Sequence, residues 1–253
     1  MIEFERKDNI AVVTLCRAPV NAINREWMER FGEILDELEG NAQIGVLRIR
    51  SALRVFCAGF DIGLIRRHLE TGGGPVAQID DTRRLQDVYF RIERLPQVTV
   101  AEINGAAMGG GLELALSCNL RIAAEEAVMG LPEATLGQVP GAGGTQRLTR
   151  LCGPGTASRI ILACESVNGS KAEELGIVQW AVPGAQLERE AAALCARIAA
   201  LPSETLAASK ACIAVQSDSG RTGYRMELEM NLRLLGTPQT QACVAAFFNR
   251  PRR

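Results

Sequence analysis

The sequence predicts an α/β fold with a helical C-terminal region, and two patterns lead to this prediction. Through most of the chain, short β-branched runs alternate with glycine-rich turns and with segments of helical periodicity, which is typical of strands and helices packed in layers. From Leu187 onward no strand pattern remains. We therefore expect a core over residues 1–195 and a helical region over residues 196–253. With 253 residues, 47% of them hydrophobic, the chain can bury a substantial core.

The first elements are a hairpin and a helix. β-branched and apolar residues predict strands over Ile2 to Glu5 and Ile10 to Leu15, joined by a turn at Asp8 and Asn9. A helix is expected between Asn24, a candidate N-cap, and Gly40, because apolar residues recur between them at helical spacing.

Two further strands are predicted, with a surface loop and a helix between them. Gly45 to Arg50 alternates as a strand does, and Val98 to Ile103 predicts a second strand. Residues 64–77 contain arginines and a glycine run, and are interpreted as a mobile surface loop. A helix is expected from about Asp80 to Leu95, where Pro96 stops it.

The same order of strand, glycine-rich turn and helix then recurs. A helix is expected to begin within Gly109 to Gly111, and a strand covers about Leu120 to Ala124. Pro132 and Glu133 predict a short helix with proline at its first position.

The last predicted strand precedes the helical tail. Ser170 and Glu173 have the spacing of a capping box, Gly176 ends that helix, and Ile177 to Val182 is the strand. The tail is expected to contain three or four helices, with breaks at Pro202, near Gly220 and at Gly236-Thr237-Pro238.

The composition argues against several classes of protein. Lys and Arg number 28 and Asp and Glu 29, so the net charge of −1 gives no general field that attracts nucleic acid or an anionic membrane. The first residues lack the basic start and apolar stretch of a secretory signal. No window reaches the about 18 uncharged apolar residues that a membrane span needs. We expect a cytoplasmic protein with no membrane partner.

The cysteines and the single histidine give no sign of a metal centre. The eight cysteines are scattered without a C-x-x-C pair, and are interpreted as reduced thiols rather than a disulfide or zinc framework. His68 lies beside two arginines and is interpreted as an ordinary surface residue, which argues against Ser-His and Cys-His mechanisms. The glycine runs lack the lysine of a Walker loop and the dinucleotide fingerprint.

Two glutamates and a glycine run are the candidate chemical groups. The amides of Gly109 to Gly111 at a helix start have no internal partner, and without Cβ atoms an anion can approach them closely. Glu113 follows three residues after Gly110 on the same helix face, in an otherwise apolar helix. A solvated helix edge remains the alternative for Glu113, and simple stabilisation of the helix dipole is the alternative for Glu133. Two carboxyls in one pocket could act as acid and base.

Four segments closely resemble the enoyl-CoA hydratase/isomerase (crotonase) family, and the resemblance extends over nearly the whole chain. They are Phe56 to Ile62, Ala101 to Ala115, Leu131 to Gly137 and Pro140 to Leu148. The resemblance implies a crotonase-like spiral of repeated ββα units followed by a C-terminal helical trimerisation region. It also implies a homotrimer or a dimer of trimers.

The resemblance further implies an acyl-CoA lyase, an enoyl-CoA hydratase that adds water reversibly and with syn geometry to a 2-enoyl-CoA thioester. Its pattern places the oxyanion-hole amides on Ala58 and Gly110. It makes Glu113 the group that orients and deprotonates water, and Glu133 the group that exchanges the proton at the α-carbon. Gly141 matches a backbone position that helps to hold the water.

The segment from Ala58 to Ile62, including Phe60 and Asp61, resembles the part of the family that lines the coenzyme A adenine and pantetheine. Coenzyme A is then part of the substrate, and no separate cofactor or metal is expected. One departure is Pro19, which stands where a lysine for the coenzyme A phosphates is often found, and Arg17 could compensate.

Three alternatives remain open. An enoyl-CoA isomerase or an acyl-CoA thioester hydrolase has the same fold, although isomerases need only one carboxylate. Some relatives resemble RNA-binding proteins, but the net charge opposes that function. The arginines that could contact phosphates are Arg66, Arg67, Arg147, Arg150, Arg250, Arg252 and Arg253.

Overall fold

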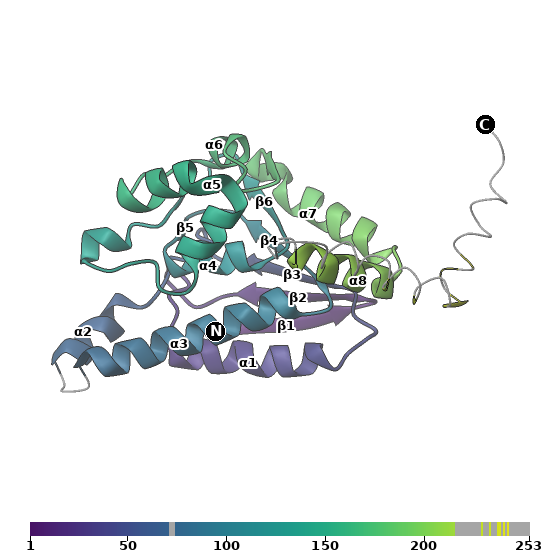
Figure 1. Ribbon diagram of the computed structural model, residues 1–253, viewed down its shortest axis with the longest axis horizontal. Helices are drawn as coiled ribbons and strands as arrows, with labels where there is room; N and C mark the ends of the chain where they lie inside the picture. Colours follow the sequence, from purple (N-terminus) through teal and green to yellow (C-terminus); the bar gives the residue numbers. More distant parts are fainter. Residues whose placement is uncertain are drawn as a thin grey trace.

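A six-stranded sheet runs through the protein, with strand order β1-β2-β3-β4-β6-β8 (Figure 1). The computed structural model describes residues 1–70 and 74–215, together with the single positions 229, 233, 237, 238, 240 and 242. β1 and β2 are antiparallel, the other neighbouring pairs are parallel, and β5 and β7 form a separate small sheet. The strands are β1 (Ile2–Lys7), β2 (Ile10–Leu15), β3 (Val46–Ser51), β4 (Val98–Ile103), β5 (Ala107–Met108), β6 (Leu120–Ala124), β7 (Met129–Gly130) and β8 (Trp180–Val182).

Helices cover this sheet and extend beyond it, so the predicted α/β fold is confirmed. α1 and α3 lie side by side, and α7 packs across β2, β3, β4, β6 and β8 (Figure 1). In the described chain the helices are α1 (Arg25–Glu39), α2 (Ile62–Glu70), α3 (Gly74–Arg94), α4 (Gly110–Ser117), the 3₁₀ helix η1 (Glu133–Leu136), α5 (Gly144–Leu162), α6 (Gly169–Glu174), α7 (Gly184–Ala199) and α8 (Ser203–Ala214).

Local sequence explains the elements that were predicted well. The Asn24 side chain accepts the Trp27 N–H at 2.9 Å, which satisfies one of the free amides at the start of α1. The buried stripe of α1 includes Trp27 and Phe31, whose rings lie 4.9 Å apart, and Gly40 ends the helix. The hairpin, α1, β3, β4, β6 and the start of α4 all agree with the sequence predictions.

The prediction of a loop over residues 64–77 was wrong. Residues 62–70 form α2, and α3 begins at Gly74, six residues before the expected start. The Asp61 side chain accepts the Gly63 N–H at 3.0 Å, as an N-cap does. Pro75 lies in the first turn of α3, where its missing N–H costs nothing. Thr71, Gly72 and Gly73 lie outside the described residues.

Three other predictions between η1 and β8 need correction, and one helix there was missed. Asn168, not Ser170, caps α6, because its side chain accepts the Lys171 N–H at 2.9 Å. The expected strand over 177–182 is limited to β8, since the amides of Ile177 and Val178 donate to the Ala172 carbonyl and close α6 instead. α5, which is broken at Gly153, has no clear signal in the sequence and was not predicted. Pro132 precedes η1 rather than occupying its first position.

The end of the described chain is helical, as expected. α7 and α8 are separated at Pro202, and the predicted division after residue 195 falls within α7 and stays a prediction. Among the described residues no single helix is long and apolar enough to cross a membrane, although α7 and α8 together meet that test and are bent by 101°. The predicted breaks near Gly220 and at residues 236–238 fall mostly outside the described residues.

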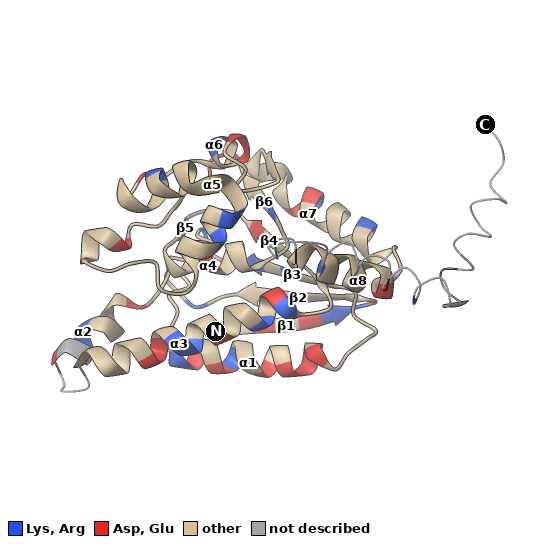
Figure 2. Cartoon of the chain, in the orientation of Figure 1, with Lys and Arg blue, Asp and Glu red and all other residues tan. Residues whose placement is uncertain are grey.

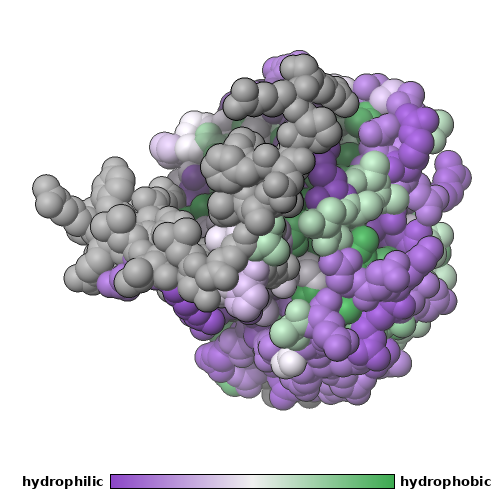
Figure 3. All heavy atoms as spheres, turned by 90° about the vertical axis from the view of Figure 1, so that its right-hand side faces the viewer, coloured by the Kyte–Doolittle hydropathy of each residue, from purple (hydrophilic) through white to green (hydrophobic). Residues whose placement is uncertain are grey.

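The surface mixes charged and apolar character. Acidic and basic residues are interspersed along α1 and α3 (Figure 2). On the face shown in Figure 3, hydrophobic residues lie among hydrophilic ones. Ile213 on α8 is 71% exposed. Seven of the eight cysteines belong to the described residues and are free thiols, while Cys243 lies outside them.

Candidate active site

A cleft of about 270 Å³ brings the predicted site residues together. Its walls come from the turn before α2, from α3, from the start of α4, from η1 and from the loop before α5. Of the residues selected from the sequence, those that line the cleft are Ala58, Phe60, Ile62, Gly110, Glu113, Glu133 and Gly141. Asp61 does not line the cleft, because it pairs with Arg17 at 3.1 Å and binds the start of α2.

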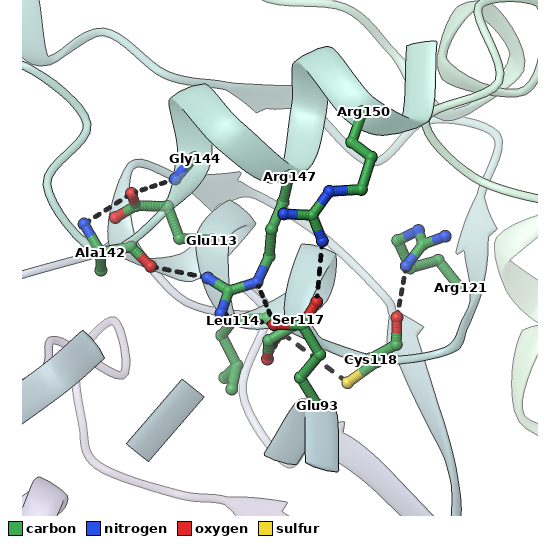
Figure 4. Close-up of polar contacts among 10 residues, drawn as sticks. All are labelled: Glu93, Glu113, Leu114, Ser117, Cys118, Arg121, Ala142, Gly144, Arg147 and Arg150. Atoms are coloured by element: carbon green, nitrogen blue, oxygen red, sulfur yellow. Dashed lines mark hydrogen bonds and ion pairs between the residues drawn. The ribbon is translucent and has the colours of Figure 1, made fainter. Parts of the chain in front are cut away.

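Glu113 is a buried carboxyl held by two main-chain amides. It lies on α4 with 2% of its surface exposed. Its Oε1 accepts the N–H of Ala142 and the N–H of Gly144, each at 2.8 Å (Figure 4). Burial raises the pKa of Glu113 to about 7, the charge of Glu133 adds to this rise, and the two hydrogen bonds oppose it. The alternative of a solvated helix edge is therefore wrong.

Glu133 reaches the cleft from the first position of η1. Burial also raises the pKa of this carboxyl. Its Oε2 is buried and has no hydrogen-bond partner in the described part of the chain. Its Oε1 lies 3.0 Å from the point that a Cβ atom on Gly109 would occupy, so Glu133 extends over the start of α4. A buried carboxyl oxygen without a partner is unusual in a purely structural setting, and such a group is able to exchange a proton with a bound molecule.

The prediction of Ala58 as an oxyanion-hole donor was wrong. The Ala58 N–H donates to the Val20 carbonyl at 3.0 Å, so it cannot point at a ligand. Within the described residues the amides of Phe60 and Gly110 have no acceptor. A Cβ atom on Gly110 would lie 3.4 Å from the Phe60 nitrogen, so the two amides are close together. Phe60 and Gly110 therefore offer two free N–H donors to the cleft.

Gly59 allows these two amides to approach each other. Its φ of +95° is a left-handed conformation that residues with a side chain rarely adopt. A Cβ atom there would lie 2.7 Å from the Met108 carbonyl oxygen and 3.1 Å from the Gly110 nitrogen. The turn before α2 can therefore lie directly against the start of α4 only because residue 59 is glycine.

Sequence reasoning missed two residues that hold the cleft in shape. The Tyr89 hydroxyl, fully buried on α3, donates to the Gly110 carbonyl at 2.6 Å, and burial raises its pKa so that it keeps its proton. The Gln86 side chain donates to the Gly141 carbonyl at 2.6 Å. One sequence signal could have indicated them: both are polar residues within or beside the apolar stripe of a helix. A polar side chain in that place usually makes a buried hydrogen bond.

Three of the arginines suggested as phosphate contacts form ion pairs with glutamates in the structure. Arg147 is buried and pairs with Glu93 at 2.9 Å, and Arg150 pairs with the same carboxyl at 3.4 Å. Arg66 lies 3.6 Å from Glu70. Burial keeps Arg147 away from a phosphate contact, whereas Arg66 and Arg150 are exposed. Arg250, Arg252 and Arg253 lie outside the described residues. The described residues contain no group of three or more His, Cys, Asp or Glu side chains placed to hold a metal ion.

The raised pKa of Glu113 predicts a pH-dependent cost to stability. An ordinary glutamate has a pKa of 4.5 and Glu113 one of about 7, so between these values the folded state holds a proton that the unfolded state releases. The free energy of unfolding therefore falls as pH rises through this range. Glu113→Gln, which cannot ionise, should be more stable than wild type by about 3 kcal/mol above pH 7, with little difference near pH 4. Thermal unfolding across this range checks the prediction.

Glu165→Gln is the matched control, because Glu165 is partly exposed and its pKa is lowered by Arg159. It should give no gain above pH 7. A gain for Glu113→Gln that does not change with pH would contradict the proposed ionisation.

Known proteins resemble this chain in sequence and in fold. The enoyl-CoA hydratase/isomerase family profile matches residues 5–251. A Bacillus subtilis (strain 168) protein named "Probable enoyl-CoA hydratase" is 39% identical over 199 residues, 78% of this chain and 76% of that protein. The short-chain-enoyl-CoA hydratase of Clostridium acetobutylicum is 33% identical over 186 residues, 73% of this chain and 69% of that protein.

The crystal structure of an enoyl-CoA hydratase from Bacillus anthracis superposes with a TM-score of 0.90 at 33% identity. The match covers 97% of this chain and 95% of that one. This likeness confirms the predicted crotonase-like fold. The chain belongs to the enoyl-CoA hydratase/isomerase family.

Proposed function

We propose that the protein is an enoyl-CoA hydratase, which adds water reversibly to the double bond of a 2-enoyl-CoA thioester. One observation supports this proposal above all: Glu113 and Glu133 line the same cleft as the two free amides of Phe60 and Gly110. This arrangement supplies two proton-exchanging groups and an anion-binding pair at one bound molecule. Coenzyme A enters as part of the substrate, and no further cofactor is required.

In the proposed reaction the two amides bind the thioester oxygen. When oxygen adds to the β-carbon of the double bond, electrons move toward the thioester carbonyl and its oxygen becomes an enolate oxygen. N–H donors aimed at that oxygen stabilise the transition state more than the substrate. The start of α4 adds the positive end of the helix dipole at Gly110.

The two carboxyls divide the proton transfers. Ionised Glu113 takes a proton from water as the water oxygen bonds to the β-carbon, and protonated Glu133 gives its proton to the α-carbon of the enolate. The net change is the addition of one water molecule, and proton exchange with solvent restores both carboxyls. Burial favours the protonated form of Glu133, which suits a proton donor.

Hydration is favoured over isomerisation because two carboxyls line the cleft, whereas moving a double bond requires one. The part of the cleft beyond these groups is mainly apolar and includes Ile65, Leu85, Leu136 and Val139. An apolar lining fits a hydrocarbon acyl chain. We also propose that the protein assembles as a homotrimer or a dimer of trimers, which light scattering would test.

Incubation with crotonyl-CoA tests the proposed function. We expect the absorbance of the conjugated thioester to fall as 3-hydroxybutyryl-CoA forms, without release of free thiol. A panel of 2-enoyl-CoA thioesters of increasing length should identify the preferred acyl chain. Conversion of a 3-enoyl-CoA without hydration would favour the isomerase, and thiol release would favour the hydrolase. Absence of hydration with every chain length would contradict the proposal.

A further inference from the structure

Arg147 is a buried cation close to the cleft but not part of its wall. It lies on α5, and 6% of its surface is exposed. Instead of lining the cleft that contains Glu113, it lines a second cavity of about 460 Å³, together with Glu93 and Arg150. Arg147 is therefore not placed to touch a molecule bound in the first cleft.

Three groups hold the guanidinium of Arg147. Its Nη1 donates to the Ala142 carbonyl at 2.8 Å. Its Nε and Nη2 donate to Oε2 of Glu93, at 3.2 and 2.9 Å (Figure 4). The ring of Phe90 lies 5.1 Å from the centre of the guanidinium, within the range of a cation–π contact. A planar group with this many fixed partners has little freedom to move.

The peptide that Arg147 binds is the one that binds Glu113. The carbonyl of Ala142 accepts from Arg147, while the N–H of Ala142 donates to Glu113. Gly144 donates the second N–H to the same carboxyl oxygen. Gly143, between them, has a φ of +103°, and a Cβ atom there would collide with Arg147. The loop over residues 142–144 therefore lies between the guanidinium and the carboxylate and touches both.

We propose that Arg147 is a positioning residue for Glu113: by binding the Ala142 carbonyl it holds the loop whose two amides orient the carboxylate. This inference rests on the proposed role of Glu113 as the group that activates water. Glu93 and Phe90 in turn fix Arg147, so an ion pair on the far side of the loop sets the geometry of the carboxyl in the cleft.

Electrostatics adds a second effect of the same residue. The groups that face Glu113 are Glu133 from η1, Tyr89 from α3 and Arg147 from α5. Burial raises the pKa of Glu113 most and Glu133 raises it further, whereas the charge of Arg147 lowers it. Glu93 partly neutralises Arg147. Removing Arg147 should therefore raise the pKa of Glu113, while removing the charge of Glu93 should lower it.

The test compares Arg147→Met and Arg147→Lys with Arg150→Met as the matched control. Arg150 pairs with the same Glu93 but is more than half exposed, and its hydrogen bond within the described residues is to Glu93 rather than to the loop. For Arg147→Met we expect kcat to fall about 10- to 100-fold, as small misplacements of a catalytic group do, with KM within about twofold. The acid limb of the pH profile should move to higher pH. Arg150→Met should match wild type.

The conservative variant separates charge from geometry. Lysine keeps the positive charge but cannot reproduce the fork that binds both Ala142 and Glu93. Arg147→Lys should therefore keep an acid limb near that of wild type, with a kcat between those of wild type and Arg147→Met. Glu93→Gln should shift the acid limb to lower pH, opposite to Arg147→Met.

A measurement without substrate keeps this inference distinct from the proposed function. The pKa of Glu113 can be followed by ¹³C NMR of the labelled carboxyl, assigned by its loss in Glu113→Gln. If wild type hydrates no enoyl-CoA, the proposed function fails, while a raised pKa in Arg147→Met still supports the placement. A folded Arg147→Met with wild-type kcat, acid limb and Glu113 pKa would overturn the inference. Changes of the same size in kcat, acid limb and Glu113 pKa for Arg150→Met would also overturn it.

Discussion

Glu113→Gln is expected to lower kcat for the hydration of crotonyl-CoA by about 10²- to 10⁴-fold, the range typical of losing a general base. Glutamine has nearly the same shape, and its carbonyl oxygen can accept the same N–H bonds from Ala142 and Gly144. An amide cannot take a proton from water, so the change removes the chemistry and leaves the packing. Steady-state kinetics should show the loss in kcat, with KM changed little.

Glu125→Gln is the control for the change in charge. Glu125 is exposed in the turn after β6 and does not line the cleft, so its substitution should leave both kinetic constants as in wild type. Glu133→Gln should also lower kcat strongly, because the proton for the α-carbon is lost. Near-normal turnover by both cleft variants would show that the two carboxyls do not perform this reaction.

Gly111→Ala is expected to destabilise the protein, although alanine is the better helix former by about 1 kcal/mol. Gly111 lies in the first turn of α4, and a Cβ atom there would lie 2.1 Å from the Cys57 carbonyl oxygen. It would also lie 2.8 Å from the Cys57 carbonyl carbon. Backbone atoms cannot rotate away, so α4 must move off the segment that leads to Phe60. Overpacking of this kind costs about 1 to 3 kcal/mol or more.

Unfolding in denaturant measures this loss, and Gly155→Ala is the matched control. Gly155 lies in α5, and a Cβ atom there would meet nothing within 4 Å. Its substitution should leave stability unchanged or raise it by up to about 1 kcal/mol. Because α4 holds Gly110 and Glu113, the residual folded Gly111→Ala should also lose activity. Equal stability of the two variants would contradict the close approach of α4 and Cys57.

The elements that sequence alone predicted are those with strong local signals. α1 has an N-cap at Asn24, a regular apolar stripe and a glycine at its end, and all three act within a few residues. Residues 64–77 were misinterpreted because arginines and glycines suggested a surface loop. The signal that decides the structure there, the capping of α2 by Asp61, is a single hydrogen bond.

The site residues that could be predicted are those that differ in polarity from their neighbours in the sequence. Glu113 is the single charge in an apolar helix, and that contrast correctly indicated burial. The error at Ala58 had another origin: its amide is taken by Val20, 38 positions earlier in the chain, and no local pattern encodes that pairing. Arg147 was offered as a phosphate contact because sequence gives its charge but not the distant Glu93 that neutralises it.

The two oxygens of the Glu113 carboxylate are not equivalent. Both lone pairs of Oε1 are occupied by the amides of Ala142 and Gly144, which leaves Oε2 to receive a proton. In the proposed reaction, a planar alkene held by its thioester oxygen would present only one of its two faces to a water molecule bound at Oε2. If the proposed hydration takes place, we expect a single enantiomer of the 3-hydroxyacyl product, because the water would attack from the side on which Oε2 lies.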